Sequence, residues 1–479
     1  MTKRARDVPA AAGPALAAEQ RAFVAAARDT RASLFLTGGA GTGKSVALRA
    51  AIAAMRARAA PGTLFVTAST GKAALDHEDA TTLHRFAGLG VGDEPTDAAV
   101  RRVGQSHKMR ELLARARWRA CETLVIEEIS MISAETFDTL HAVACAVRRR
   151  PLSVPFGGIR LIMCGDFFQL PPVPNEAQRR ARQPARYAFE AAAWARLAPR
   201  AVVLRQVHRQ SEAPAFIALL NEVRTGHVSA ETERALRGRM NAAFASDAAV
   251  ASVFPLNRDV AALNEQRLRE LPGRVHTFRA VDYASSAEDA VLLRDVTALP
   301  VLELKVGAQV MLIKNIEVAG EKLANGMVGV VTGVGAGAKP SIHVRFDDVP
   351  GASVPIEEAE WEFRDHAACA SLEPRIVEIN DDGEIVQPPA IDADASAPVR
   401  ARRTQYPLVL AYAVSAHKSQ GQTLTCAVST CLRSCFEAGQ AYVILSRVRR
   451  LEQLSLRSLD TTRIRASPKV LAFYAALGA

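Results

Sequence analysis

Residues 38–45 of the 479-residue chain read Gly-Gly-Ala-Gly-Thr-Gly-Lys-Ser, which fills every fixed position of the phosphate-binding loop G-x-x-x-x-G-K-[ST]. The preceding residues 33–37 predict a short buried strand, and residues 45–60, rich in Ala, Leu, Met and Arg, predict a helix. In this setting the glycines let backbone N–H groups turn toward phosphate oxygens, and the helix N-terminus adds its positive dipole end. The stretch therefore predicts a nucleotide site on an α/β sheet.

Single residues of this stretch have distinct roles in such a site. Lys44 is placed to reach the β- and γ-phosphates, and the Ser45 hydroxyl is placed to hold Mg²⁺. Gln20, on a helix predicted over residues 16–27, has an amide that can read the adenine edge, although a solvated helix glutamine is the more ordinary interpretation. The predicted ATP contacts within the loop are Gly38, Gly39, Ala40, Gly41, Thr42, Gly43, Lys44 and Ser45. A glycine-rich turn without a ligand is the alternative, and the loop alone does not say what hydrolysis would drive.

The chain is basic, with 60 Lys and Arg against 50 Asp and Glu and a pI of about 9.5. This excess fits a polyanionic partner, while a membrane surface and an inert basic surface are the alternatives. The seven cysteines are scattered without a C-x-x-C pair, which predicts reduced, mostly buried thiols in an intracellular protein. The sequence contains no apolar run long enough for a membrane span, and residues 1–14 predict a mobile tail.

Two further apolar runs predict buried strands that end in polar residues at one edge of the sheet. Residues 123–126 lead into Glu127 and Glu128. In a phosphate-loop ATPase this is the place of the Mg²⁺-side carboxylate and of the carboxylate that activates water. Residues 159–166 lead to Gln169, which is suited to sensing a γ-phosphate. Because the carboxyl ends of parallel strands meet at one edge, these side chains are expected near the loop.

Residues 64–69 predict another strand, and the polar segment after it is suited to nucleic acid. Its hydroxyl side chains can bond phosphates, and its ring side chains, His84 and Phe86, can stack on a base. The alternative is a capped helix start with Phe86 in the core, which is plausible for Phe86 alone.

The order of the predicted elements divides the chain into two α/β domains and an insertion. Alternating strands and helices predict a first parallel-sheet domain over residues 15–200, with a charged surface insertion at 88–117. A second such domain is predicted over 201–300 and 405–479. One of its helices carries an apolar face and ends before a glycine, and the residues concerned are Phe216, Leu219, Leu220, Val223 and Gly226. Residues 301–404 predict a small antiparallel barrel, with an acidic, flexible segment at 377–399.

Seven stretches taken in order resemble the motifs of one family. They are VTASTGKAA, TTLHRFAG, EEISMIS, PFGGIRLIMCGDFFQLPPV, VHRQ, AHKSQGQT and GQAYVILSRVRR. Together they are similar to the Pif-one (petite integration frequency) family of DNA helicases, relatives of RecD in the 5′-to-3′ branch of superfamily one. The resemblance runs from about residue 16 to 458. It implies two RecA-like domains with ATP and Mg²⁺ between them and an SH3-like barrel inserted in the second.

The resemblance also implies roles for single residues of the nucleotide site. Gln20 would contact adenine, and Glu128 would orient or deprotonate the attacking water. Gln169 would sense the γ-phosphate, and Arg209 and Arg447 would be arginine fingers that reach across the cleft. The implied catalytic set is Lys44, Glu128, Gln169, Arg209 and Arg447. Gln20 and Gly421 join the implied ATP contacts. Ser45 and Glu127 would serve Mg²⁺, although the family has aspartate where this chain has Glu127.

The DNA path and the biological setting are implied in the same way. Single-stranded DNA would cross both domains and touch Thr67, Thr82, His84, Phe86, His417 and Lys418, with a strand-separating wedge at residues 88–117. The expected partners are single-stranded and forked DNA, not a membrane, and the expected state in solution is a monomer. The expected place is the nucleus or another DNA-containing compartment, and the expected processes are replication, repair, recombination or telomere maintenance.

Two other classes of protein are consistent with parts of the sequence. The first is an ATP-regulated single-stranded DNA-binding protein or translocase that does not unwind, which would follow if Glu127 disables turnover. The second is a metabolic phosphate-loop enzyme such as a kinase. The paired arginines 209 and 447 and the two-domain repeat argue against the second.

Overall fold

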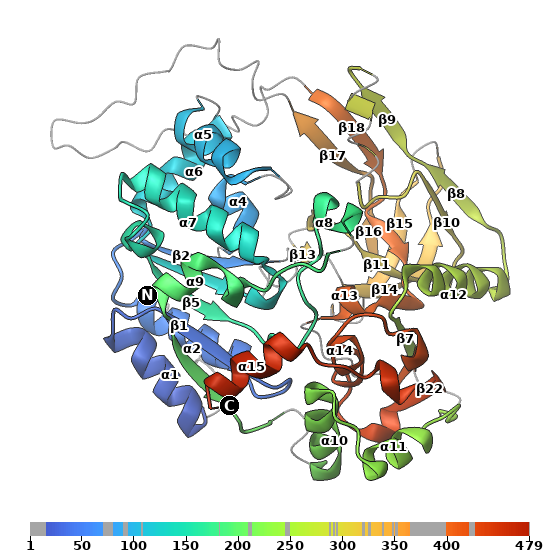
Figure 1. Ribbon diagram of the computed structural model, residues 1–479. Coiled ribbons are helices and arrows are strands. Elements are labelled where there is room, and N and C mark those ends of the chain that lie inside the picture. The colour runs from blue at the N-terminus through green and yellow to red at the C-terminus, as the bar shows by residue number, and fades with distance from the viewer. Residues whose placement is uncertain are drawn as a thin grey trace, which may run out of the picture.

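The computed structural model describes residues 16–69, 80–89, 94–106, 109–181, 183–208, 213–244, 250–286, 289–290, 293, 296–318, 321–323, 327–337, 340–346, 349, 353–364, 399–420 and 427–478. The predicted tail at 1–14, the acidic segment at 377–398, Arg209 and Gly421 lie outside these residues. Within them, two α/β units and a β-rich unit lie side by side (Figure 1).

The first domain contains a six-stranded parallel sheet in the order β3-β2-β4-β5-β1-β6. Its strands are β1 (Leu34–Gly38), β2 (Leu64–Ala68), β3 (Thr81–Thr82), β4 (Thr123–Glu127), β5 (Arg160–Cys164) and β6 (Arg200–Leu204). The helices in this part of the chain are α1 (Ala18–Asp29), α2 (Lys44–Arg56), α4 (Leu83–Ala87), α5 (Thr96–Gln105), α6 (Met109–Ala120), α7 (Ala134–Arg148), α8 (Glu176–Arg180) and α9 (Ala192–Leu197). The predicted parallel sheet is therefore confirmed.

Alternate residues of the central strands face two separate apolar layers, because successive strand side chains point to opposite sides. Leu34 and Leu36 of β1 pack in the layer that contains α1 and α2. Phe35, between them, packs in the layer that contains α7. This two-sided burial explains why the strands are continuous apolar runs.

The predicted domain boundary at residue 200 is wrong. Residues 200–204 form β6, which pairs in parallel with β1 from Leu34↔Arg200 to Gly38↔Leu204. A full five-residue ladder with β1 places this strand in the first sheet, so the chain leaves the first domain after Leu204. The residues predicted as a surface insertion form α5 and α6, and α6 buries Ala114 and Trp118.

The second domain has a four-stranded parallel sheet in the order β20-β7-β21-β22. Its strands are β7 (Val250–Phe254), β20 (Ala413–Ser415), β21 (Ala427–Cys431) and β22 (Leu454–Ser458). The helices of this part are α10 (Pro214–Thr225), α11 (Ala230–Arg237), α12 (Asn257–Glu270), α13 (Ala416–Ser419), α14 (Gln440–Leu445) and α15 (Pro468–Ala476). The predicted apolar face of α10 is confirmed, as is its end at Gly226, which has a φ of 75°.

The β-rich insertion extends over residues 276–410 and so begins earlier than predicted. Its main sheet is antiparallel in the order β16-β15-β14-β11-β19, and smaller sheets pair β10-β8, β12-β13 and β17-β18-β9. The strands are β8 (His276–Arg279), β9 (Val281–Ala284), β10 (Val301–Leu304), β11 (Gln309–Leu312), β12 (Ile316–Val318), β13 (Glu321–Leu323), β14 (Val328–Val334), β15 (Ile342–Phe346), β16 (Val354–Ile356), β17 (Ala359–Arg364), β18 (Val399–Gln405) and β19 (Leu408–Leu410). Among the described residues no ladder joins β16 to β19, so the predicted barrel closure is not confirmed.

The sequence predicts one buried strand over residues 408–415, but the structure contains two. β19 pairs antiparallel with β11 of the insertion, whereas β20 pairs in parallel with β7 of the second domain. The apolar run therefore passes from one unit to the other at residues 411–412, a change that periodicity cannot show.

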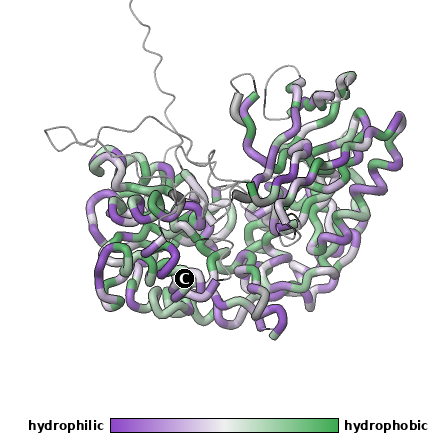
Figure 2. The backbone as a smooth tube through the Cα atoms, turned by 90° about the horizontal axis from the view of Figure 1, so that it is seen from above, coloured by the Kyte–Doolittle hydropathy of each residue, from purple (hydrophilic) through white to green (hydrophobic). Residues whose placement is uncertain are grey.

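The C-terminal helix α15 returns to the first domain (Figures 1 and 2). Its Phe473 ring stacks on Phe189 at 4.3 Å between ring centroids and lies 5.6 Å from Phe167 and 6.1 Å from Phe35. The two α/β domains are thus joined through the core of the first as well as by the linker after β6.

The described cysteines agree with the prediction of reduced thiols. Cys121, Cys145, Cys164 and Cys435 are free and buried, and Cys431 is free and half-buried. None of the described helices combines the length and apolarity needed to span a membrane.

Candidate nucleotide site between the two domains

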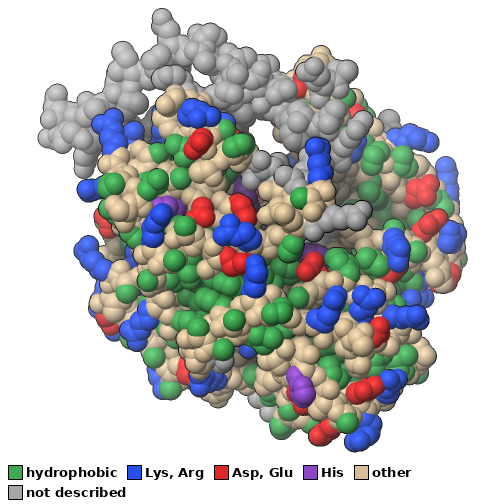
Figure 3. Space-filling view, viewed as in Figure 1, with side chains coloured by type: hydrophobic (Ala, Val, Ile, Leu, Met, Phe, Trp, Pro, Cys, Tyr) green, Lys and Arg blue, Asp and Glu red, His purple; other side chains and the backbone are tan. Residues whose placement is uncertain are grey.

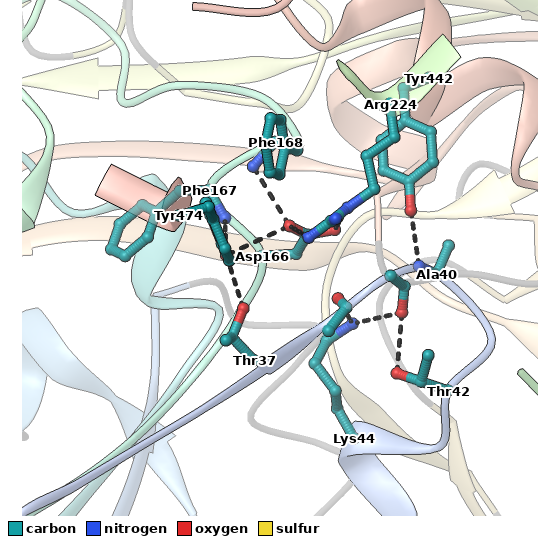
Figure 4. Close-up of polar contacts among 12 residues, drawn as sticks. Thr37, Ala40, Thr42, Lys44, Asp166, Phe167, Phe168, Arg224, Tyr442 and Tyr474 are labelled. Atoms are coloured by element: carbon teal, nitrogen blue, oxygen red, sulfur yellow. Dashed lines mark hydrogen bonds and ion pairs between the residues drawn. The ribbon is translucent and has the colours of Figure 1, made fainter. Parts of the chain in front are cut away.

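The phosphate-binding loop connects β1 to α2 in the predicted strand–loop–helix order (Figure 4). Lys44 Nζ donates to the carbonyls of Gly38 at 3.0 Å and Gly39 at 3.1 Å, and Thr42 Oγ1 donates to Gly39 O at 2.9 Å. Gly43 has a φ of 77°, and a Cβ at this position would lie 2.4 Å from Gln20 Nε2. A side chain at this position would be strained by the left-handed backbone and would displace the amide of Gln20.

Gln20 braces the loop from the first helix. Its Nε2 donates to Thr42 O at 3.2 Å and Gly43 O at 3.4 Å, and its Oε1 accepts from Ala17 N at 2.8 Å. The side chain is buried, and both ends of its amide are engaged. Adenine contact by Gln20 remains a prediction, and it would require exchange of at least one of these hydrogen bonds.

Ser45 and Glu127 lie together, as predicted for a Mg²⁺ site. Ser45 Oγ donates to Glu127 Oε1 at 3.0 Å, and the Glu127 side chain is buried at the end of β4. A hydroxyl and a carboxylate are the hard oxygen donors that Mg²⁺ prefers. The donor set therefore fits the ion, and the longer glutamate stem reaches the serine directly.

Glu128 occupies a strained position between the two domains. Its backbone is left-handed, with φ 55° and ψ 46°, a conformation that costs a non-glycine residue about 1–3 kcal/mol. Burial raises the pKa of its carboxyl, and the positive charge of Lys44 opposes that rise. Gln420 of the second domain donates from Nε2 to Glu128 Oε2 at 3.3 Å and to Ser130 Oγ at 3.4 Å. The carboxylate is therefore held by a hydrogen bond from the second domain and lies within the electrostatic influence of Lys44 of the first.

Arg447 lies at the same interface and is 1% exposed. Its Nε donates to Val443 O at 2.6 Å, Nη1 to Ser419 O at 3.2 Å, and Nη2 to Ser446 Oγ at 2.9 Å. Its charge also lowers the pKa of Glu128, as one of several smaller effects. Its role as an arginine finger stays a prediction, as does that of Arg209.

Gln169 lies on the segment after β5 and is buried. Its Oε1 atom has no hydrogen-bond partner among the described residues, which leaves one polar atom of this predicted γ-phosphate sensor uncommitted. The start of α14 packs against this segment. A Cβ at Gly439, whose φ is 77°, would lie 2.4 Å from the carbonyl oxygens of Phe168 and Gln169.

A buried ion pair links the same segment to the second domain, and sequence reasoning missed it. Arg224 of α10 donates to Asp166 through Nη2 at 2.9 Å and Nε at 3.2 Å. Its guanidinium lies 4.2 Å from the centroid of the Phe168 ring and 5.2 Å from that of Tyr474 (Figure 4). The only sequence signal for this ion pair was the stretch GDFFQLPP, which contains Asp166, and the sequence predicted no partner for that aspartate.

A second missed contact reaches the loop itself. Tyr442 of α14 accepts a hydrogen bond at its hydroxyl from the Ala40 N–H at 2.6 Å, and the side chain is 2% exposed. Burial raises the pKa of this phenol to about 12. The second domain therefore touches the phosphate loop, the Gln169 segment and Glu128, through Tyr442, Gly439 and Gln420.

Comparison with known proteins agrees with this arrangement. A family model described as PIF1-like helicase matches residues 15–234, and one for the 2B domain of DNA helicase Pif1 matches residues 295–334. A crystal structure of Pif1 helicase from Candida albicans is 31% identical, with a TM-score of 0.81 over 97% of this chain and 99% of that one. The chain belongs to the PIF1-like helicase family.

Two further members extend the comparison. The chain is 40% identical over 466 residues to the ATP-dependent DNA helicase PIF1 of Homo sapiens, covering 97% of this chain and 64% of the human protein. The chain thus spans less than two thirds of the length of that relative. A crystal structure of Bacteroides Pif1 bound to single-stranded DNA is 26% identical, with a TM-score of 0.73 over 97% of both chains.

Two of the DNA contacts implied by the resemblance are wrong in this structure. Phe86 is 0% exposed and packs against Trp118 and Phe65, with ring centroids 4.8 and 5.2 Å away. Thr67 is also 0% exposed, and its Oγ1 donates to Val125 O at 2.7 Å. A strand crossing the surface reaches neither side chain. The apolar stripe of α4, residues 83, 86 and 87, was the sequence signal for burial, because i, i+3 and i+4 share one helix face.

The other implied DNA residues stay predictions. Thr82 caps α4 by accepting from Arg85 N at 3.4 Å, and His84 on that helix is half-buried. His417, on α13 of the second domain, is also half-buried, and the side chain of Lys418 lies outside the described part. Burial lowers the pKa of both histidines, so each is a neutral ring at pH 7 rather than a phosphate-binding cation.

The basic side chains do not by themselves locate a DNA path. On the face shown in Figure 3, Lys and Arg are scattered among other residues rather than gathered in one patch. The excess of 60 basic over 50 acidic residues therefore supports a polyanionic partner without saying where it lies.

Proposed function

We propose that the chain is an ATP-dependent DNA helicase that moves 5′ to 3′ on single-stranded DNA and unwinds duplex DNA. The observation that carries the proposal is the hydrogen bond from Gln420 of the second domain to Glu128 of the first, at 3.3 Å. A site completed by both domains can change shape when its nucleotide changes. The relatives named as ATP-dependent DNA helicases support the activity, and the Bacteroides structure with single-stranded DNA supports the partner.

In the proposed reaction the first domain binds and polarises the nucleotide. Lys44, held at the loop by two carbonyls, neutralises phosphate charge. Ser45 and Glu127 would hold Mg²⁺, which would supply positive charge to neutralise the phosphates. Glu128 orients the attacking water and takes its proton, and its raised pKa brings the carboxyl closer to the pH at which a general base works best.

The second domain supplies the coupling to movement. Arg447 and Arg209 stabilise charge on the transferring phosphoryl group, as arginine fingers do within one chain. Hydrolysis removes the charge that they bind, so the interface between the domains loosens. If the grip of each domain on DNA alternates in strength, closure and opening move the strand. Stacking and backbone contacts tolerate any sequence, which suits a motor.

Finer features of the proposal rest on the family. We place a strand-separating wedge on α5 and α6 and an SH3-like unit in the insertion. We expect forked duplexes as the main substrate, with quadruplexes and RNA–DNA hybrids as further ones. The expected setting is replication, repair, recombination or telomere maintenance in the nucleus or another DNA-containing compartment, and the expected state is a monomer in solution.

An unwinding assay on tailed duplexes tests the proposal. We expect a duplex with a 5′ single-stranded tail to be unwound in the presence of ATP and Mg²⁺, and one with only a 3′ tail to remain intact. Lys44→Ala is the control, since it removes phosphate neutralisation without touching DNA; it should bind DNA but not unwind it. Efficient unwinding of the 3′-tailed duplex alone would contradict the polarity.

The same assay separates the helicase from the alternative without unwinding. Glu127 is the observation that favours this alternative, because its longer stem changes the geometry offered to Mg²⁺. An ATP-regulated DNA-binding protein or translocase would show DNA binding, with or without DNA-stimulated hydrolysis, and would leave both tailed duplexes intact.

A further inference from the structure

Helix α14 is the one element of the second domain described here as meeting the phosphate loop and the Gln169 segment together. Gly439 at its start packs against the carbonyls of Phe168 and Gln169. Tyr442, one turn later, bonds to Ala40 of the loop. Arg447, just beyond its end, donates back to Val443 O at 2.6 Å. A shift of this helix therefore changes its contacts with the phosphate loop and with the Gln169 segment, and it moves Arg447 at the same time.

The Tyr442 hydroxyl uses half of its hydrogen-bonding capacity in this arrangement. A phenol can accept one hydrogen bond and donate another. The hydroxyl oxygen accepts from the Ala40 N–H, and no acceptor for the phenolic proton is found among the described residues. Because the side chain is 2% exposed, bulk water does not readily serve as that acceptor. A buried donor whose acceptor is not among the described residues still requires one, and a ligand atom can supply it.

The position of the hydroxyl limits what that ligand atom is. Backbone N–H groups of a phosphate-binding loop line the phosphate site, so a hydroxyl bonded to one of them lies at the edge of that site. Burial raises the pKa of Tyr442 to about 12, which keeps the phenol protonated as a donor throughout the working pH range. A neutral donor facing an anionic oxygen gives a charge-assisted hydrogen bond.

We propose that Tyr442 is a nucleotide-contacting residue that distinguishes ATP from ADP, donating its phenolic proton to a terminal phosphate oxygen while its lone pair holds the Ala40 N–H. This inference rests on the proposed ATP-driven function. It gives the second domain a direct contact with the phosphate group that hydrolysis removes. Binding of ATP then draws α14, and with it Arg447, toward the first domain.

The assignment is tested by measuring the affinities for a non-hydrolysable ATP analogue and for ADP in the absence of DNA, where no hydrolysis takes place. Tyr442→Phe keeps the ring and removes only the hydroxyl. We expect this variant to bind a non-hydrolysable ATP analogue roughly 10-fold more weakly, since it loses one charge-assisted hydrogen bond, with the ADP affinity changed less than about 2-fold. An unchanged preference for the analogue over ADP would overturn the proposal. So would an equal loss of both affinities, which is what a purely structural role predicts.

Tyr474→Phe is the matched control. Tyr474 is another buried phenol between the domains, but its hydroxyl bonds to Thr37 Oγ1 at 2.5 Å and Phe167 N at 3.2 Å rather than to the loop residue Ala40. The Tyr474→Phe variant should have a lower melting temperature, with an unchanged ratio of the affinity for the ATP analogue to the affinity for ADP. An equal fall of this ratio in both variants would assign the effect to interface packing and overturn the proposal.

A spectroscopic measurement tests the same contact without removing the Tyr442 hydroxyl, so its result does not depend on whether the Tyr442→Phe variant folds. Fluorotyrosine placed at position 442 should show a ¹⁹F shift with the ATP analogue and not with ADP, and an identical response to both would overturn the assignment. These measurements are separate from the helicase proposal. A wild-type protein that binds ATP but fails to unwind DNA would contradict the proposed function and leave the test of Tyr442 intact.

Discussion

The nucleotide side and the proposed DNA side of the first domain differ in how reliably a sequence motif predicts the position of its side chains in the folded protein. On the nucleotide side, Ser45 and Glu127 meet at 3.0 Å although they are 82 residues apart. On the DNA side, Phe86 and Thr67 belong to equally recognisable motifs, yet both are fully buried. A phosphate loop acts through its backbone, which the glycines determine locally. A stacking residue acts through its exposure, which depends on what the rest of the chain places over it.

The largest effect should come from removing the carboxylate on the nucleotide side. Glu128→Gln keeps the size and the possible contact with Gln420 but removes the base and its charge. We expect the DNA-stimulated ATPase rate to fall by roughly 10²–10⁴-fold, the usual contribution of a general base, while ATP binding persists. Steady-state rates on single-stranded DNA and equilibrium nucleotide binding measure the two quantities.

Glu127→Asp is the matched change one residue away. It restores the carboxylate of the family and should remain active with a shifted Mg²⁺ optimum, because it moves the oxygen that meets Ser45 by about one carbon–carbon bond, roughly 1.5 Å. Full activity in Glu128→Gln would mean that Glu127 is the catalytic carboxylate and that the two roles are reversed.

A smaller effect should separate the two faces of α4. Phe86→Ala removes a ring packed against Trp118 and Phe65, so it should destabilise folding by about 3–5 kcal/mol without a specific loss of DNA affinity. His84→Ala, on the half-buried side of the same helix, should instead weaken single-strand binding by about 1–3 kcal/mol if its ring stacks on a base. Chemical denaturation and single-strand titrations give the two energies. If the Phe86→Ala variant has normal stability and binds DNA weakly, the Phe86 ring contacts DNA and its assignment to the core is contradicted.

The smallest effect concerns pH. Burial raises the pKa of Glu128, so its base form is lost on acidification at a higher pH than for an ordinary glutamate, whose value is 4.5. The ATPase rate should therefore decline in acid before unperturbed carboxylates titrate, and this decline should vanish from the residual activity of Glu128→Gln. A pH–rate profile at saturating ATP and DNA checks this expectation.

A stability control must accompany that profile. Burial lowers the pKa of His84 and His417 from the ordinary value of 6.5, so the folded state disfavours their protonation. The stability that the folded protein gains from keeping these two rings neutral is complete above pH 6.5. It is lost as the pH falls from 6.5 through the lowered pKa values of the folded state. Melting temperatures at each pH distinguish this loss from titration of Glu128. A rate that follows the melting temperature alone would contradict the role of the carboxylate.

Much of the architecture could be predicted from local patterns. The strand entering the loop, the helix leaving it, the apolar face of α10 and its end at Gly226 all follow from periodicity and glycine placement. The boundary at residue 200 could not be predicted, because the run at 200–204 can form a strand of either domain. Only its ladder with β1 assigns it to the first sheet.

The sequence by itself determined the phosphate loop, the parallel sheets and the carboxylates at the end of β4. These features depend on residues close together in the chain, where backbone preference and side-chain periodicity decide the outcome. The tertiary structure alone decided that Arg224 pairs with Asp166, that Gln420 reaches Glu128 and that Tyr442 reaches Ala40. Each of these contacts joins segments brought together by packing. The partners of the last pair are 402 residues apart, a separation over which no local pattern carries information.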